Sequence, residues 1–158
     1  MAWNRRVTAQ IPTSSPDQRA TVMQPFYWNL RVYWEDTDAG GVVYHSQYLN
    51  FFERTRTEWL RSAGIDQSRL GANEGIIFVV HTMNIEFVSP ARLDDELRIS
   101  VALEKLGGAT MALAQDMIRI ADGTVISRAA VKVACLNAGN FTPARIPERI
   151  KTEILNGT

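Results

Sequence analysis

The chain has 158 residues, of which 46% are hydrophobic and 22% charged, with 17 basic and 17 acidic side chains. A chain of this length is expected to fold as one domain, and its balanced charge without Lys or Arg clusters argues against a nucleic-acid partner. No apolar stretch approaches the roughly 20 residues that span a membrane. Cys135 is the only cysteine, so an internal disulfide is excluded and a reducing, cytoplasmic compartment is expected.

Residues 1–24 differ in composition from the rest of the chain. They are rich in Thr, Ser, Gln, Pro and Arg and show no hydrophobic periodicity, so we expect a disordered leader. Arg5 and Arg6 are not followed by the apolar segment of a secretory signal, and no signal peptide is expected. Residues 25–158 are expected to form a single domain.

Two elements of different periodicity open this domain. Residues 26–34 are aromatic and β-branched, which is typical of a strand. From Ser46 to Ala63 the period becomes helical. The apolar stripe of this helix contains Tyr48, Phe52, Thr55 and Trp59. Gly64 is a suitable stop for a helix of about five turns.

Four strands are expected after the helix, joined largely by short turns. They cover residues 76–88, 97–104, 109–120 and 124–136. The pairs Gly107-Gly108 and Asp122-Gly123 are hairpin signals, and hairpins make neighbouring strands antiparallel. Pro147 suits the first turn of a short C-terminal helix.

This order of elements predicts an α+β fold. The alternation along the strands gives the sheet one apolar face, and the chain offers one long helix to cover it. A five-stranded antiparallel sheet curved around one central helix is the hot-dog fold. The sheet edge and apolar surface left over favour a symmetric oligomer.

The run from Glu35 to His45 joins the first strand to the helix and concentrates the reactive groups. It holds three carboxylates, two adjacent glycines, a tyrosine and a histidine. A carboxylate there is a candidate base or nucleophile at a carbonyl, and the N–H groups of the first helical turn are candidate oxyanion donors. Aromatic neighbours predict a semi-buried pocket that desolvates an Asp. Gly40 and Gly41 indicate a tight bend or close approach to a ligand.

Two other interpretations of this run compete with catalysis. The spacing Asp36-x-Asp38-x-x-Gly41 begins like a calcium loop, but the later ligand positions hold Gly40, Tyr44 and Gln47. We therefore expect no metal site. In the second interpretation the carboxylates decorate a solvated turn, and Asp38 or Ser46 caps the helix.

The remaining candidate side chains favour structural roles. His45 lies at the positive end of the helix, which disfavours the imidazolium, so a neutral donor or acceptor is expected if it is not simply structural. His81 alternates with apolar residues and is expected in the core or an interface. Cys135 shares a strand face with Val131 and Val133, so it is expected to be buried and inert. No nucleophile elbow, P-loop or dinucleotide-binding fingerprint occurs.

Two segments resemble the YbgC-type acyl-CoA thioesterases. The first is Val32–His45 followed by Tyr48-x-x-Phe51-Phe52-Glu53-Arg54-x-Arg56-Thr57-Glu58, and the second is Ser89-Pro90-Ala91-Arg92-Leu93-Asp94-Asp95. The resemblance runs from about Leu30 to Pro147. These are hot-dog enzymes related to 4-hydroxybenzoyl-CoA thioesterase, and many Gram-negative bacteria encode them beside the Tol–Pal envelope system.

The resemblance implies hydrolysis of an acyl-CoA thioester without a cofactor. Asp38 occupies the catalytic carboxylate position, as general base or nucleophile, while Glu35 and Asp36 support it or are solvated. Tyr44 and His45 stand at the helix start, where a backbone N–H polarises the thioester carbonyl. The residues expected to contact substrate are Gly40, Gly41, Val42, Arg92 and Arg145, with Arg149 as a further candidate for the CoA phosphates. The site would lie at a subunit interface of a homodimer or homotetramer, with acyl carrier protein as an alternative acyl donor.

Two other functions stay open on the sequence. A hot-dog hydratase or dehydratase usually holds its acid and histidine closer together in sequence than Asp38 and His45 are. A non-catalytic adaptor for acyl carrier protein or envelope machinery does not require a carboxylate held by glycines. Both features favour the thioesterase.

Overall fold

The structure is a computed structural model that describes residues 23–157. The leader expected over residues 1–24 therefore lies almost wholly outside the described residues. The elements in chain order are β1 (Phe26–Arg31), a 3-10 turn η1 (Trp34–Asp36), α1 (His45–Ser62), α2 (Gln67–Glu74), β2 (Ile76–Phe87), β3 (Glu96–Leu106), β4 (Thr110–Arg119), β5 (Val125–Asn137) and α3 (Glu148–Asn156).

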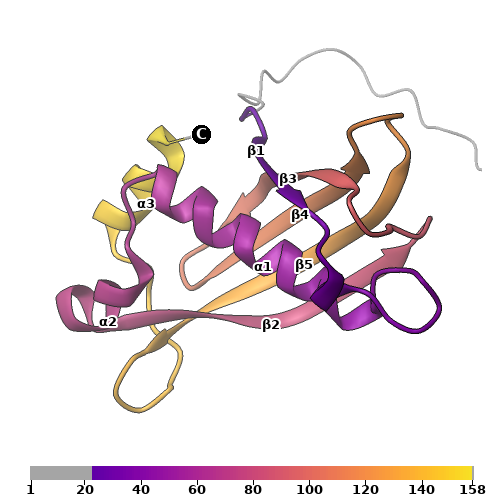
Figure 1. Cartoon of the computed structure of the whole chain (residues 1–158). Helices are drawn as coiled ribbons and strands as arrows, with labels where there is room; N and C mark the ends of the chain where they lie inside the picture. Colours follow the sequence, from indigo (N-terminus) through magenta and orange to yellow (C-terminus); the bar gives the residue numbers. More distant parts are fainter. Residues whose placement is uncertain (1–22, 158) are drawn as a thin grey trace, which may run out of the picture.

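The five strands form one antiparallel sheet, and α1 lies across one of its faces (Figure 1). The strand order is β1-β3-β4-β5-β2, so β1 and β2 are the two edges. This arrangement confirms the predicted α+β hot-dog fold.

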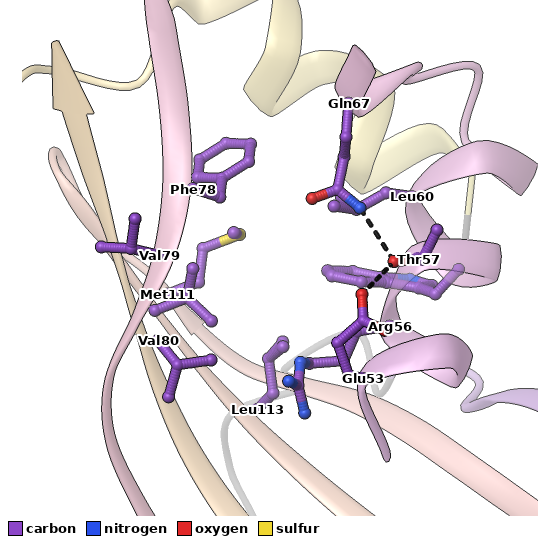
Figure 2. A pocket seen from close by; sticks show the side chains of 12 residues that line it. Glu53, Arg56, Thr57, Leu60, Gln67, Phe78, Val79, Val80, Met111 and Leu113 are labelled. Atoms are coloured by element: carbon purple, nitrogen blue, oxygen red, sulfur yellow. Dashed lines mark hydrogen bonds between the residues drawn. The ribbon is translucent and has the colours of Figure 1, made fainter. Parts of the chain in front are cut away.

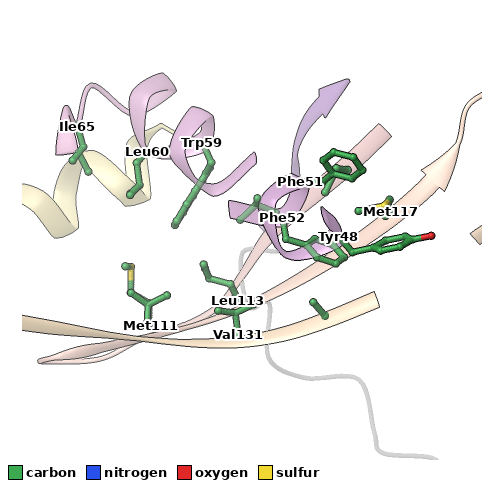
Figure 3. Packing of buried hydrophobic residues seen from close by; sticks show 14 of the residues in the cluster. Tyr48, Phe51, Phe52, Trp59, Leu60, Ile65, Met111, Leu113, Met117 and Val131 are labelled. Atoms are coloured by element: carbon green, nitrogen blue, oxygen red, sulfur yellow. The ribbon is translucent and has the colours of Figure 1, made fainter. Parts of the chain in front are cut away.

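The core lies between α1 and the sheet (Figure 3). The predicted stripe of Tyr48, Phe52, Thr55 and Trp59 is confirmed, since each is at most 4% exposed. Opposite it, Leu97, Met111 and Leu113 of the sheet are at most 2% exposed. Each large apolar side chain that is fully buried contributes about 1.5–3 kcal/mol, so this face fixes α1 on the sheet.

The helix α2 was not predicted from the sequence. Its start is capped by Asp66, whose side chain accepts a hydrogen bond from the Ser68 N–H at 3.0 Å. It ends at Gly75 with a φ of +67°, a conformation that favours glycine. Both signals are visible in the sequence, but the eight-residue helix buries only Leu70, so it lacks an apolar stripe. The predicted stop of α1 at Gly64 is confirmed by its φ of +80°.

The structure corrects the expectations for the first strand and for His81. β1 ends at Arg31 rather than at residue 34, because Trp34–Asp36 turn into a 3-10 helix. The pairing of β2 with β5 shifts between Val80 and Thr82, which leaves His81 in a bulge. A bulge breaks the alternation on which the prediction rested. His81 is consequently exposed in the chain, so its expected place in the core is wrong, while a place in an interface stays a prediction.

Other local predictions hold. At the β3–β4 hairpin the Gly107 N–H donates to the Thr110 carbonyl at 2.8 Å, and the β4–β5 turn places Gly123 at a φ of +71°. α3 follows Pro147 as its N-cap. Cys135 is 1% exposed, and its burial raises the pKa of the thiol. No helix between residues 23 and 157 is long and apolar enough to cross a membrane.

Candidate active site

A tight turn holds Asp38 between η1 and α1. The Gly41 N–H donates to the Asp38 carbonyl at 3.0 Å, and the Asp38 N–H donates to the Val42 carbonyl at 3.0 Å. The Asp38 carboxylate accepts the Gly40 N–H at 2.7 Å. A Cβ at position 40 would lie 3.0 Å from that carboxylate oxygen, and Gly41 has a φ of +75°. Both glycines are therefore explained by the turn that presents Asp38.

Asp36 is the buried carboxylate of this run, at 3% exposure. Its side chain accepts the Tyr33 N–H at 2.8 Å, and its carbonyl accepts the Tyr44 N–H at 2.8 Å. These two bonds tie the 3-10 turn to the residue that precedes α1. Asp36 thus has a supporting role at this site, whereas Glu35 is exposed.

The start of α1 presents backbone donors to solvent. Tyr44 is the N-cap and provides no side-chain cap, so neither Asp38 nor Ser46 caps the helix. Within residues 23–157 the N–H groups of His45 and Ser46 have no acceptor, while that of Gln47 donates to the Tyr44 carbonyl at 2.9 Å. Free N–H groups at a helix start favour an anionic oxygen.

The segment 90–95 braces the Asp38 turn from behind. The Ala91 carbonyl accepts the Val43 N–H at 2.9 Å, and the Ala91 N–H donates to the Tyr48 hydroxyl at 3.1 Å. Tyr48 was expected only as a core residue, but its hydroxyl also positions this segment. Burial raises the pKa of that phenol, so it stays a neutral partner for the backbone.

Arg119 ties the same segment to the end of β4, a role that was not predicted from the sequence. Its guanidinium donates to the Asp95 carboxylate at 3.0 Å, to the Pro90 carbonyl at 2.8 Å and to the Asp122 carboxylate at 3.0 Å. The hydrogen bond to Asp95 is the main cause of the raised pKa of Arg119. Its partners in the segment, Asp95 and Pro90, are 24 and 29 residues away in sequence, so no local pattern could reveal the contact.

The candidate arginines lie at opposite ends of α1. Arg92 belongs to the bracing segment beside the Asp38 turn, and it is exposed. Arg145 lies next to Ile146, whose N–H donates to Gly108 in the β3–β4 turn at 2.8 Å. This turn and α3 lie at the C-terminal end of α1 (Figure 1), a helix of 18 residues and thus about 27 Å long. Arg149 is paired with Glu74 and Glu153.

The expected semi-buried pocket around Asp38 is not formed by the single chain. Asp38 and His45 are exposed, and Trp34, Tyr33 and Tyr44 point outward with exposures of 79%, 62% and 46%. The Tyr44 and His45 rings lie 4.4 Å apart at the helix start. The aromatic side chains therefore surround the turn without covering it.

A pocket of about 110 Å³ lies at the other half of α1, between that helix and β2; we call it the α1–β2 pocket (Figure 2). Its lining is mostly apolar and includes Trp59, Leu60, Phe78, Val79, Val80, Met111, Leu113 and Val133. Gln67, Thr57 and Glu53 form a hydrogen-bonded row at its rim, with distances of 3.1 and 2.7 Å. Arg56 also lines it.

Comparison with known protein families agrees with this fold and with the position of the Asp38 turn. The model of the thioesterase-like superfamily matches residues 32–154, which include the Asp38 turn, α1 and the whole sheet except β1. The crystal structure of a probable thioesterase from Bartonella henselae is 37% identical, with a TM-score of 0.74 over 78% of this chain and all of that one. These matches define the class, a hot-dog protein of the thioesterase-like superfamily.

Curated relatives narrow the class further. Acyl-CoA thioesterase YbgC of Haemophilus influenzae is 43% identical over 126 residues, which cover 80% of this chain and 91% of that protein. Acyl-CoA thioester hydrolase YbgC of Escherichia coli O157:H7 is 42% identical over 128 residues, which cover 81% and 94%. The chain belongs to the YbgC family, as its sequence motifs predicted.

Proposed function

We propose that this protein hydrolyses acyl-CoA thioesters to CoA and a free carboxylic acid. The observation that carries this proposal is the turn that presents the Asp38 carboxylate immediately before the free N–H groups of His45 and Ser46. A carboxylate and an oxyanion site are the two groups that thioester hydrolysis requires. The names of the curated relatives support the same reaction.

In the proposed reaction the thioester carbonyl oxygen lies against the N–H groups at the start of α1. Asp38 either deprotonates a water that attacks the carbonyl carbon, or attacks it directly to form a mixed anhydride that water then hydrolyses. In both routes the C–S bond breaks, the thiolate of CoA leaves, and the developing oxyanion is held by backbone donors. Gly40, Gly41 and Val42 would bring backbone close to the thioester.

We also propose that two copies complete the site by pairing their β2 edges. β2 is an edge strand, and Val80, Phe87 and Val88 at or just after it are 44–51% exposed. An unpaired, apolar edge of this kind favours strand addition. Antiparallel pairing around a two-fold axis would join two five-stranded sheets into one. We place the protein in the cytoplasm, where its single cysteine, the buried Cys135, would stay reduced.

This pairing would bring the two halves of the site together. Tyr48, near the start of α1, packs edge-on against Phe87 at the end of β2, with ring centroids 5.3 Å apart. The α1–β2 pocket instead lies over Phe78 to Val80, at the beginning of β2. Antiparallel strands place the end of one beside the beginning of the other. The Asp38 turn of one copy would therefore face the pocket of the second.

The arginines fit the same scheme. Arg92 beside the Asp38 turn is exposed and unpaired among the described residues, so it is available for a CoA phosphate. Arg145 is at the far end of α1 in its own chain, and only the second copy could bring it near the same substrate. Either CoA or the phosphopantetheine of acyl carrier protein could present the thioester.

The test is thiol release from a panel of acyl-CoA thioesters by the parent chain and by Asp38→Asn. We expect hydrolysis by the parent and a loss of at least about a hundredfold in the variant, the scale of a lost acid–base group. The control is Glu35→Gln, an exposed carboxylate in the same run, which should retain its activity. Unchanged turnover in Asp38→Asn would remove Asp38 from the mechanism, and no thiol release from any thioester by the parent would refute the hydrolase.

A further inference from the structure

Arg56 is a cation inside the α1–β2 pocket with a neutral hydrogen-bond partner. Its guanidinium reaches from α1 towards the sheet beside Leu113 (Figure 2). One Nη donates to the Gln115 side-chain oxygen at 2.9 Å, and the Gln115 amide in turn donates to the Phe52 carbonyl at 3.2 Å. Gln115 is 1% exposed, so this contact fixes the orientation of the guanidinium and leaves other N–H donors of Arg56 for a ligand.

Arg56 makes no ion pair within residues 23–157. No carboxylate lies within ion-pair distance of it, in contrast to Arg119, which is also partly buried but pairs with Asp95 at 3.0 Å. The Glu53 carboxylate, which accepts a hydrogen bond from Thr57 at the rim, is near enough to favour the charged form of Arg56 without pairing with it. Burial lowers the pKa of Arg56, because an apolar surrounding disfavours the charged form. Such a site favours an anion.

The size of the pocket limits what could accompany that anion. Its volume is about 110 Å³, somewhat smaller than the roughly 150 Å³ of an apolar cavity that takes up benzene. A chain of three or four methylene groups fits such a space. Met111, Leu113 and Val133 would contact the methylenes, while Arg56 stands where a charged end would lie.

We propose that the α1–β2 pocket selects short acyl groups that end in a carboxylate, and that Arg56 binds this carboxylate. The substrates would be monothioesters of short dicarboxylic acids. The inference rests on the proposed thioesterase function and names its substrate class. Arg56 would act as a specificity-determining residue through a charge-assisted, two-pronged hydrogen bond, for which the planar guanidinium is suited.

The experiment compares glutaryl-CoA with pentanoyl-CoA, two thioesters with the same number of acyl carbons that differ in the terminal carboxylate. For the parent protein we expect kcat/KM to be at least about tenfold higher for glutaryl-CoA, the scale of one hydrogen bond to a charged group. Arg56→Met should abolish this preference by lowering kcat/KM for glutaryl-CoA while leaving that for pentanoyl-CoA within about threefold. Arg56→Lys should retain part of the preference.

The matched control is Arg61→Met, the same substitution on an exposed arginine of the same helix that pairs with Glu58. It should keep the parent's preference. Equal or lower kcat/KM of the parent for glutaryl-CoA overturns the proposal without any variant, as does an Arg56→Met protein that loses both activities equally. If the parent hydrolyses neither these nor other acyl-CoA thioesters, the proposed function fails instead, so the two failures are distinguishable.

Discussion

The catalytic groups and the acyl pocket lie at different ends of α1. The N-terminal end carries the Asp38 carboxylate and free N–H groups, but its surroundings are exposed. The C-terminal half carries a mostly apolar pocket of about 110 Å³ with the cation of Arg56, away from the free N–H groups at the helix start. Between His45 at the start of α1 and Arg56 in the pocket lies about 17 Å of helix. Within one chain the reacting group and the acyl pocket are therefore too far apart for a short acyl group.

Because these two parts lie apart in one chain, the edge strand β2, through which two copies would pair, matters for the reaction. Tyr48 and Phe87 tie the catalytic end of α1 to the end of β2, whereas Phe78 to Val80 tie the pocket to its beginning. A two-fold axis through paired β2 strands would bring unlike ends together. The exposed aromatics around Asp38 would then be covered by the second copy, and the carboxylate would gain the dry environment that the sequence suggested.

The largest expected effect comes from His81→Pro, which should separate the two copies and so keep the Asp38 turn of one away from the pocket of the other. His81 lies in a bulge with no paired residue on β5, so we expect proline there to leave the β2–β5 pairing intact and to disturb strand addition at the free edge of β2. We expect a monomer by sedimentation velocity and a loss in kcat/KM of at least about a hundredfold, because positioning is lost. His81→Ala should remain a dimer and active. A fully active monomer would disprove the two-copy site.

A smaller effect is expected from loosening the catalytic end alone with Arg119→Met. The substitution removes the hydrogen bonds to Asp95 and the Pro90 carbonyl and leaves the partly buried Asp95 carboxylate without its cation. It should lower the free energy of unfolding by about 1–3 kcal/mol and reduce kcat, while the preference between glutaryl- and pentanoyl-CoA stays the same. Urea unfolding and the two assays measure these quantities.

The control for this variant is Arg128→Met, which removes an exposed ion pair to Asp116 at 3.6 Å. Pairs of this kind contribute at most about 1 kcal/mol, so we expect a small change. If both variants are equally stable, the bracing of segment 90–95 by Arg119 is unimportant. If Arg119→Met alters the acyl preference, the two ends of α1 are not independent.

The smallest expected effect is a change in how the free energy of unfolding depends on pH, caused by Tyr48 near the start of α1. Burial raises the pKa of Tyr48 above its ordinary value of 10.0, so above about pH 10 the unfolded chain releases this proton first. The free energy of unfolding should therefore fall as the pH rises past 10, by at most about 1.4 kcal/mol per pH unit. Tyr48→Phe should fall less steeply in urea titrations from about pH 8 to about pH 11. Parallel curves would contradict a buried, neutral phenol.

Periodicity predicted the layers of the fold because burial on one face imposes it. The stripe from Tyr48 to Trp59 and the alternation along β3 indicated which faces meet, and glycine marked the stop of α1 at Gly64. Prediction failed where a local exception intervened. The bulge at His81 reverses the alternation, and α2 buries too little to show a stripe.

For the candidate site, the sequence indicated Asp38 and the helix start but not their supports. Tyr48 was assigned to the core, and the anchors made by Arg119 and Asp95 were not visible, because their partners lie in other elements. Arg56 was not predicted as a site residue. Its significance lies in what surrounds it, namely a pocket and no carboxylate partner.

The sequence by itself determined the hot-dog class, the YbgC family and the turn that presents Asp38, because these depend on local pattern, glycine geometry and motif identity. Only the tertiary structure decided that Asp38 is exposed, that Asp36 is the buried carboxylate, and that Arg56 shares a pocket with β2. The physical reason is that burial and charge compensation depend on residues far apart along the chain. Such neighbours meet only when the helix packs on the sheet.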